Sequence, residues 1–272
     1  ARYIKRHVEL YPEIDRVKFW DDLFALNRRR IRELGDAFAA HGLGWLKYQV
    51  SVRADQIKPE LIKRFRRMNV TDLFIGIESG SPETLKHIDK RYDLAAVHRA
   101  MDLLRHEPFA VTASFIIGFP HENERHLRET YDLIRTAPLS LAQVFLLAPY
   151  PGTIEWQRAL ARGLVQDSPD FDWSLLDEAV STMNPKAVLG SALVLSEHLD
   201  RPTLYRWLLR FRRIVNRKRH RYALHLLLHD RRRFLRNLVH NSPLRVPLAR
   251  FAGRGLPPPP TPPGCGVGAS AD

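Results

Sequence analysis

DLFIGIESG, residues 72–80, is the part of the sequence that says most about the architecture. Four of its first six residues are large and apolar, and the run ends in a polar turn. A short, nearly continuous apolar run of this kind is typical of a buried strand in a parallel sheet. The next residues, Ser81-Pro82-Glu83, predict the start of a helix, because they offer a capping hydroxyl, a first-turn proline and an acid that favours the helix dipole.

The same alternation of strand and helix repeats on both sides of this stretch. Further strands are expected at residues 17–20, 45–52, 111–117 and 143–148. The helices between them have recognisable ends, since Gly42 is a natural C-terminal cap, Pro59 lies in a first turn and Asp93 is a capping residue. We therefore predict an α/β fold, a partial parallel β/α barrel with five visible strands, followed by an α-helical C-terminal appendage.

The chain of 272 residues is expected to divide into three parts. These are the partial barrel at 1–163, a helical C-terminal region at 164–250 and a Pro/Gly-rich tail at 251–272, which is expected to be disordered. The helical region should contain two long helices, at 197–218 and 221–239. The formal net charge of +13 is concentrated there, because Asp230 is the only acid between Arg201 and Arg236.

A single cysteine, Cys265, lies in the Pro/Gly-rich tail. This excludes a disulfide framework or a multi-cysteine metal site within the chain and predicts a reducing, cytoplasmic compartment. No signal peptide or membrane-spanning apolar run is recognisable. The twelve histidines suggest no metal site. His225 and His229 are expected on a solvated helical face, and His121 is expected at the surface.

Polar or turn residues follow all five predicted strands. In chain order they are Asp21-Asp22, Arg53, Glu78-Ser79-Gly80, the segment 118–122 and the segment 149–153. Each has a simpler interpretation by itself, since Asp22 could cap a helix and Arg53 could pair with Asp55. Because the active site of a parallel β/α barrel forms at the carboxyl ends of its strands, their recurrence predicts one functional face.

Taken together, these segments resemble the radical S-adenosylmethionine (SAM) superfamily, in its cobalamin-binding and methylthiotransferase-like branch. The similar stretches are VKFWDDLF (17–24), VRAD (52–55), FIGIESGS (74–81), SFIIGFPHE (114–122) and PYPGT (149–153). The third, fourth and fifth together are specific, whereas DD or PGT alone would be weak. The likeness covers about residues 15 to 160 and extends more loosely to Phe171-Asp172-Trp173.

The resemblance implies three cofactors: SAM, a 4Fe–4S cluster and, for this branch, cobalamin. An external one-electron reductant then drives cleavage of SAM to a 5′-deoxyadenosyl radical, while the protein holds SAM and excludes water. Family members bind the cluster through a CxxxCxxC loop after the first of six strands. This chain has neither that loop nor that strand, so both are expected upstream of Ala1, and the chain as it stands is expected to assemble no cluster.

The resemblance also implies which residues hold SAM. Asp21 or Asp22 is expected to bind the methionyl ammonium group, and Arg53 is expected to bind the carboxylate. The other expected contacts come from Glu78 and Ser114 to the ribose hydroxyls or the amine, and from Ile116, Gly118 and Pro149 to the adenine.

Two other functions remain open from the sequence. One is a non-catalytic β/α-barrel scaffold or pseudoenzyme, and the other is a phosphate-binding barrel enzyme, which the absence of a Gly-rich loop disfavours. The substrate, a small molecule or a lipid, cannot be derived from the sequence. The basic helices at 206–236 predict either a solvated face or a peripheral contact with an anionic membrane surface. Nucleic acid is a weaker candidate because the aromatic residues there have core spacing.

Overall fold

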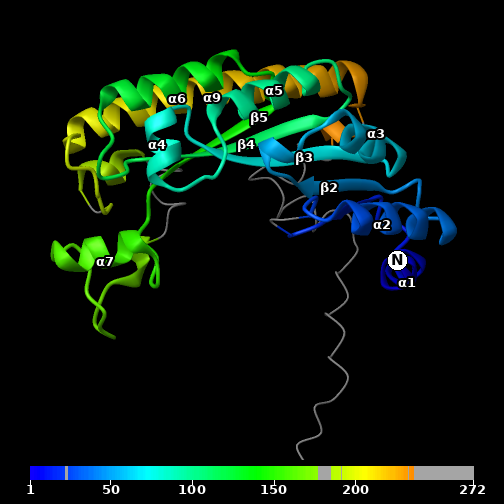
Figure 1. Ribbon diagram of the computed structural model, residues 1–272, viewed down its shortest axis with the longest axis horizontal. Helices are drawn as coiled ribbons and strands as arrows, with labels where there is room; N and C mark the ends of the chain where they lie inside the picture. Colours follow the sequence, from blue (N-terminus) through cyan, green and yellow to red (C-terminus); the bar gives the residue numbers. More distant parts are fainter. Residues whose placement is uncertain (22–23, 177–184, 191, 232, 236–272) are drawn as a thin grey trace, which may run out of the picture. The chain divides into compact units, whose positions relative to one another are not determined.

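The computed structural model describes residues 1–21, 24–176, 185–190, 192–231 and 233–235. Five strands form one sheet in the order β1-β2-β3-β4-β5, and all neighbours are parallel (Figure 1). The strands are β1 (Arg16–Lys18), β2 (Lys47–Ser51), β3 (Val70–Glu78), β4 (Ala110–Ile117) and β5 (Leu141–Leu146). All five predicted strands and the predicted half-barrel are confirmed.

Helices connect the strands, as a parallel sheet requires. They are α1 (Arg2–Leu10), α2 (Arg28–Ala40), η1 (Ala54–Gln56), α3 (Pro59–Arg67), α4 (Pro82–His87), α5 (Leu94–Leu104), α6 (Glu124–Thr136), α7 (Ile154–Ala161), η2 (Trp173–Leu176), η3 (Pro185–Leu189) and α9 (Arg201–His229). The expected ends of α2 and α5 are confirmed. Gly42 follows α2 with φ +68°, and Asp93 caps α5 by accepting a hydrogen bond from the Ala96 N–H.

The start of α4 differs from the prediction in one respect. Pro82 occupies the first turn, as expected, but the Ser81 hydroxyl makes no capping hydrogen bond. Its oxygen is buried without a hydrogen-bond partner. The Ser81 N–H donates instead to the hydroxyl of Ser79, 3.1 Å away, so that the turn after β3 is closed by Ser79.

The two faces of the sheet have different surroundings. Side chains of β3 and β4 that point towards α5 and α6 form the core, and Ile75, Ile77 and Phe115 have no exposed surface. On the opposite face, Gly76 and Ile116 are partly exposed. The strands were predicted from near-continuous apolar runs, which suggested burial on both faces. Among the described residues, the helices α5 and α6 cover one face, and residues on the other face are partly exposed.

Two helices were predicted, with a break at residues 219–220, but α9 runs without interruption over 29 residues from Arg201 to His229. The chain is helical again at residue 231 and at residues 233–235. No glycine or proline lies between Thr203 and His229 to break α9. The helical spacing of six apolar residues in the sequence of α9 predicts a core face. Leu204, Trp207, Leu208, Phe211 and Ile214 are buried, whereas the sixth residue, Val215, is partly buried. The chain forms two compact units, Ala1–Tyr222 and Ala223–Asp272, so the boundary falls within α9. The predicted boundaries at residues 163 and 250 stay predictions, and the tail 251–272 lies outside the described residues.

Residues after β5 pack into a second, smaller apolar cluster around α7. Trp156 stacks on Trp173 with ring centroids 5.8 Å apart, and Phe171 meets Trp173 edge to face at 5.2 Å. The Phe171-Asp172-Trp173 segment therefore folds back on the helix that follows the PYPGT stretch. Among the described residues, no helix is long and apolar enough to cross a membrane.

Candidate functional site

A charged cluster lies beside the carboxyl ends of β2 and β3. Arg53 follows β2 and donates from Nε and Nη2 to the two carboxylate oxygens of Asp55, at 3.0 and 3.1 Å. This confirms the simple pairing expected for the two residues. The hydrogen bond that Arg53 donates to Asp55 is the main reason that the pKa of Arg53 is raised, so the guanidinium keeps its charge in this partly buried position.

Glu78 ends β3 and forms an ion pair with Lys90, with 2.8 Å between Oε1 and Nζ. Only 19% of each side chain is exposed. Glu78 has φ +71°, a conformation that costs free energy for a residue other than glycine, and the strand register shifts between Gly76 and Glu78. Strained backbone of this kind is concentrated at functional sites.

Lys90 and Tyr92 connect the residues predicted on β2 and β3. The Lys90 carbonyl accepts a hydrogen bond from Arg53 at 3.5 Å, while the Tyr92 hydroxyl donates to the Gly76 carbonyl at 2.8 Å. Arg53 also lies 5.1 Å from the centre of the Tyr92 ring. Burial raises the pKa of Tyr92 well above its usual value, so the hydroxyl stays neutral and keeps its hydrogen bond. The sequence analysis missed Lys90 and Tyr92, because they come from the loop between α4 and α5 and belong to no recognisable motif.

The inner face of the sheet forms a smooth floor next to this cluster. In the strand register Gly76 lies beside Ser114, and Ser114 lies beside Gln143. Ile116, on the same face as Ser114, lies beside Phe145. A side chain at Gly76 would place its Cβ 2.5 Å from the Glu78 carboxylate. The floor is therefore flat near Gly76, with a hydroxyl from Ser114 and an apolar surface from Ile116.

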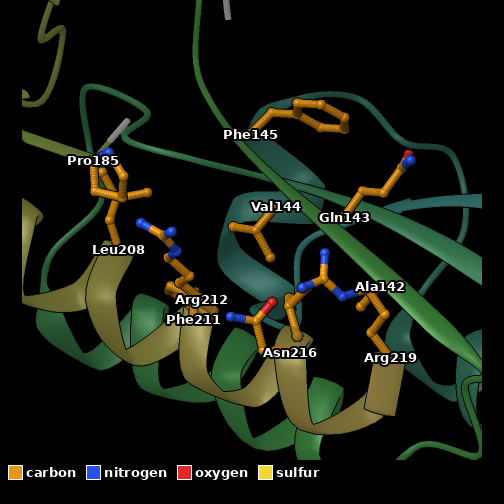
Figure 2. Close-up of a pocket in the computed structure, with 11 residues that line it drawn as sticks. Ala142, Gln143, Val144, Phe145, Pro185, Leu208, Phe211, Arg212, Asn216 and Arg219 are labelled. Carbon is orange, nitrogen blue, oxygen red and sulfur yellow. The ribbon is translucent and has the colours of Figure 1, made fainter. Parts of the chain in front are cut away.

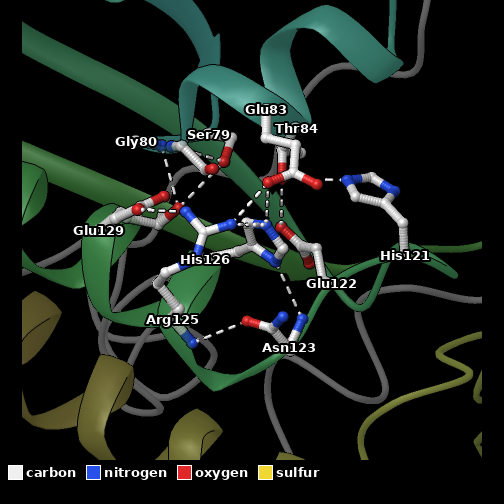
Figure 3. A network of polar contacts seen from close by, with 12 residues as sticks. Ser79, Gly80, Glu83, Thr84, His121, Glu122, Asn123, Arg125, His126 and Glu129 are labelled. Atoms are coloured by element: carbon white, nitrogen blue, oxygen red, sulfur yellow. Dashed lines mark hydrogen bonds and ion pairs between the residues drawn. The ribbon is translucent and has the colours of Figure 1, made fainter.

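A second polar network surrounds the turn after β4 (Figure 3). Glu122 is completely buried and accepts hydrogen bonds from the N–H groups of Gly118 and Phe119, at 2.7 and 3.2 Å, and from the Thr84 hydroxyl at 3.2 Å. Despite these donors, burial raises the pKa of Glu122 to about 7. Gly118 has φ +90°, and a Cβ there would lie 2.8 Å from Cδ1 of Leu146, so this turn requires glycine.

Two histidines complete this network. His126 accepts a hydrogen bond at Nδ1 from the Asn123 N–H, so its proton is on Nε2, which donates to Glu83 at 3.0 Å. His121 was expected at the surface but is partly buried, with its ring 3.9 Å from that of His87. Burial, and then the neighbouring His87, lower the pKa of His121 to about 4.

The remaining predicted site residues have varied surroundings. Asp21 forms an ion pair with Arg30 of α2. Asp22 lies outside the described residues. Pro149 is buried just after β5. The roles assigned to all of these residues, and to Arg53, Glu78, Ser114, Ile116 and Gly118, stay predictions.

A groove of about 390 Å³ lies between the edge strand β5 and α9 (Figure 2). Its lining includes apolar groups from Val144 and Phe211 and polar groups from Gln143, Arg212 and Arg219. Gln143 lies beside Ser114 in the strand register, so the groove is next to β4, the strand that carries Ser114.

Comparison with known proteins agrees with the resemblance seen in the sequence. Residues 13–134 match the family model described as the radical SAM superfamily. Residues 13–134 are therefore similar to this superfamily. The match runs from just before β1 into α6, and so includes the charged cluster and the Glu122 turn.

Related proteins with this domain include methyltransferases and methylthiotransferases. An uncharacterized methyltransferase of Pyrococcus horikoshii is 30% identical over 156 residues, covering 56% of this chain and 33% of its own. A threonylcarbamoyladenosine tRNA methylthiotransferase of Thermotoga maritima is 31% identical over 38% of this chain and 25% of its own. A bacteriochlorophyllide d C-12(1)-methyltransferase of Chlorobaculum tepidum is 28% identical over 66% of this chain and 38% of its own.

A solved structure supports the fold. The radical SAM methyltransferase TsrM of Kitasatospora setae, solved with cobalamin and a 4Fe–4S cluster bound, superposes with a TM-score of 0.53 at 17% identity. The superposition covers 62% of this chain and 32% of TsrM. This chain thus spans between a quarter and two fifths of the length of these four proteins.

The donor groups of this chain fit SAM but do not fit the family's iron–sulfur cluster. Within the residues that the structure describes, no group of three or more His, Cys, Asp or Glu side chains could hold a metal ion. The one cysteine of the sequence, Cys265, lies outside them and cannot supply several thiolates. By contrast, the charged cluster beside Gly76 offers groups of both signs, which are the kinds of group that the ammonium and the carboxylate of SAM require.

Proposed function

We propose that the half-barrel is the SAM-binding region of a radical SAM enzyme related to the cobalamin-dependent methyltransferases and the methylthiotransferases. The observation that carries this proposal is the arrangement at the carboxyl ends of β2, β3 and β4. There the Glu78–Lys90 ion pair and Arg53 adjoin a floor formed by Gly76 and Ser114. The radical SAM domain match supports the reaction class.

Each group of this arrangement has a role in the proposal. Arg53 binds the methionyl carboxylate through the guanidinium N–H groups that are not hydrogen-bonded to Asp55. Glu78 accepts hydrogen bonds from the ammonium group or from the ribose hydroxyls. Ser114 binds the ribose, while Ile116 packs against the adenine and Gly118 permits close approach of the backbone. Asp21, Asp22 and Pro149 complete the site as the resemblance implies.

When bound, SAM supplies either a methyl group or radical chemistry to the substrate, with an external one-electron reductant. The residues of this chain bind and orient SAM and keep water from it. We propose cobalamin as a further cofactor, supported by the cobalamin-bound TsrM structure. The substrate is proposed to be a small molecule or a lipid.

Calorimetric titration of the chain with SAM tests the site. Glu78→Gln and Arg53→Met should each weaken binding about tenfold or more, since each removes a charge-assisted hydrogen bond. Arg91→Met is the matched control, because Arg91 lies in the same loop as Lys90 and its ion pair with Asp89 is largely exposed. Unchanged binding in both site variants, or no binding of SAM to the wild type at millimolar concentration, would contradict the proposal.

The single cysteine favours a second candidate function, a non-catalytic scaffold or pseudoenzyme that never held a cluster. The reading frame upstream of Ala1 separates the two candidates. A CxxxCxxC loop encoded there supports the enzyme. A start codon close to Ala1, with no cysteines between them, supports the scaffold.

A further inference from the structure

One face of α9 within the first compact unit carries a row of exposed arginines. Their spacing of three or four residues places them on the same side of the helix, and they are Arg206, Arg210, Arg213, Arg217 and Arg221. The buried residues Leu204, Phe211 and Ile214 recur with the same period on another side, against the barrel core. The arginine row therefore faces away from the core.

Arg206 interacts electrostatically with Asp200, but the other four arginines have no such acidic neighbour among the described residues, unlike arginines on other helices. On α2 and α6, Arg29, Arg125 and Arg135 pair with acids three or four residues away. The sequence of α9 contains no Asp or Glu, and within the described residues no ion pair involves any member of the arginine row. A solvated face usually mixes both charges, as α2 and α6 do, so a largely uncompensated row indicates an anionic partner.

The second compact unit, taken by itself, exposes apolar side chains. Leu224, Leu227 and Leu228 are 56%, 40% and 64% exposed, and Leu235 is 59% exposed. The first three have the spacing of one helix face. Arg231 lies among these leucines in the sequence. Exposed leucines combined with basic residues are typical of helices that lie in the interface of a membrane.

We propose that α9 and the exposed leucines of the second unit bind the surface of an anionic lipid membrane. The arginine row supplies attraction to lipid phosphates, and the leucines enter the boundary between head groups and acyl chains. Nucleic acid fits less well, since Trp207 and Phe211 are buried and no strongly exposed aromatic side chain is present in the described part of α9 to stack on bases. This surface does not depend on the proposed SAM site.

Sedimentation with vesicles tests the proposal. The 272-residue chain should bind vesicles of phosphatidylcholine with phosphatidylglycerol at least tenfold more strongly than vesicles of phosphatidylcholine alone, and the preference should weaken as salt is raised. The double variant Arg213→Glu/Arg217→Glu should lose at least tenfold in affinity. The matched control Arg67→Glu/Arg128→Glu changes the net charge equally, on exposed residues of α3 and α6, and should stay within twofold of the wild type.

The leucines have a control of the same kind. Leu224→Ser/Leu228→Ser should reduce the binding that persists at high salt, whereas Leu10→Ser/Leu26→Ser, with similar exposures of 62% and 57%, should not. Circular dichroism of each variant checks that the fold is intact. Three outcomes would overturn the proposal: equal and negligible binding to both kinds of vesicle, equal losses in test and control variants, or tighter binding to RNA than to anionic vesicles.

Discussion

Replacing Glu122 by glutamine should change how the stability of the protein depends on pH. Burial raises the pKa of this carboxyl group to about 7 in the folded state, against an ordinary value of 4.5. As pH rises from 4.5 towards 7, the unfolded state releases the proton while the folded state retains it, so the folded state loses stability. Between pH 5 and pH 8 this single group lowers the free energy of unfolding by about 2 to 3 kcal/mol.

Glutamine keeps the shape of the side chain but cannot ionise. Its amide oxygen can still accept from the N–H groups of Gly118 and Phe119, so the turn after β4 should be preserved. Urea unfolding at several pH values should therefore show Glu122→Gln gaining about 2 to 3 kcal/mol relative to the wild type between pH 5 and pH 8. A constant difference between the two proteins across this range would refute the reasoning.

His121 provides a control, because its effect on the stability of the folded state changes with pH in the opposite direction. Its pKa is lowered to about 4, so the neutral ring is favoured in the folded state, and stability falls as pH drops from about 6.5 towards 4. His121→Gln should remove this loss on the acid side. Between pH 7 and pH 8 the free energy of unfolding of His121→Gln should change with pH as it does in the wild type. In the same range Glu122→Gln should still differ from the wild type in this pH dependence.

Two further predictions concern backbone geometry and helix ends. Gly80→Ala would place a Cβ 2.5 Å from the carbonyl oxygen of Glu129, so we expect a loss of about 1 to 3 kcal/mol in thermal unfolding. Gly44→Ala, which meets nothing within 4 Å, is the control, and equal melting temperatures for the two variants would contradict the close contact. Asp93→Ala removes the cap on the Ala96 N–H and should cost about 1 kcal/mol, measured by urea unfolding. Asp93→Ser should recover most of that stability, and a loss as large as that of Asp93→Ala would argue against capping.

The strands could be predicted from sequence because they leave local patterns. The apolar run at 72–78 corresponds to β3, observed at 70–78, although in β3 the buried residues from Leu73 onwards mostly alternate with partly exposed ones. The GFPHE turn was also recognisable, because a left-handed residue next to a helix start restricts residue choice.

Other features depend on contacts between distant residues and left no local pattern. Lys90 pairs with Glu78 only because the loop between α4 and α5 folds back over the end of β3. The burial of Glu122 arises from packing of its turn against Thr84 of α4. The predicted break at residues 219–220 was wrong, because the absence of Gly and Pro allowed α9 to continue to His229.

The order of the sheet has a consequence for how the chain folds during synthesis. Among the five described strands, each pairs only with strands next to it in the sequence, so none must wait for a distant segment before it can join the sheet. Successive strands are separated by one or two helices. Each βα unit can therefore add to the growing sheet soon after it leaves the ribosome, and closing the loop between neighbouring strands costs less entropy than a long-range pairing would.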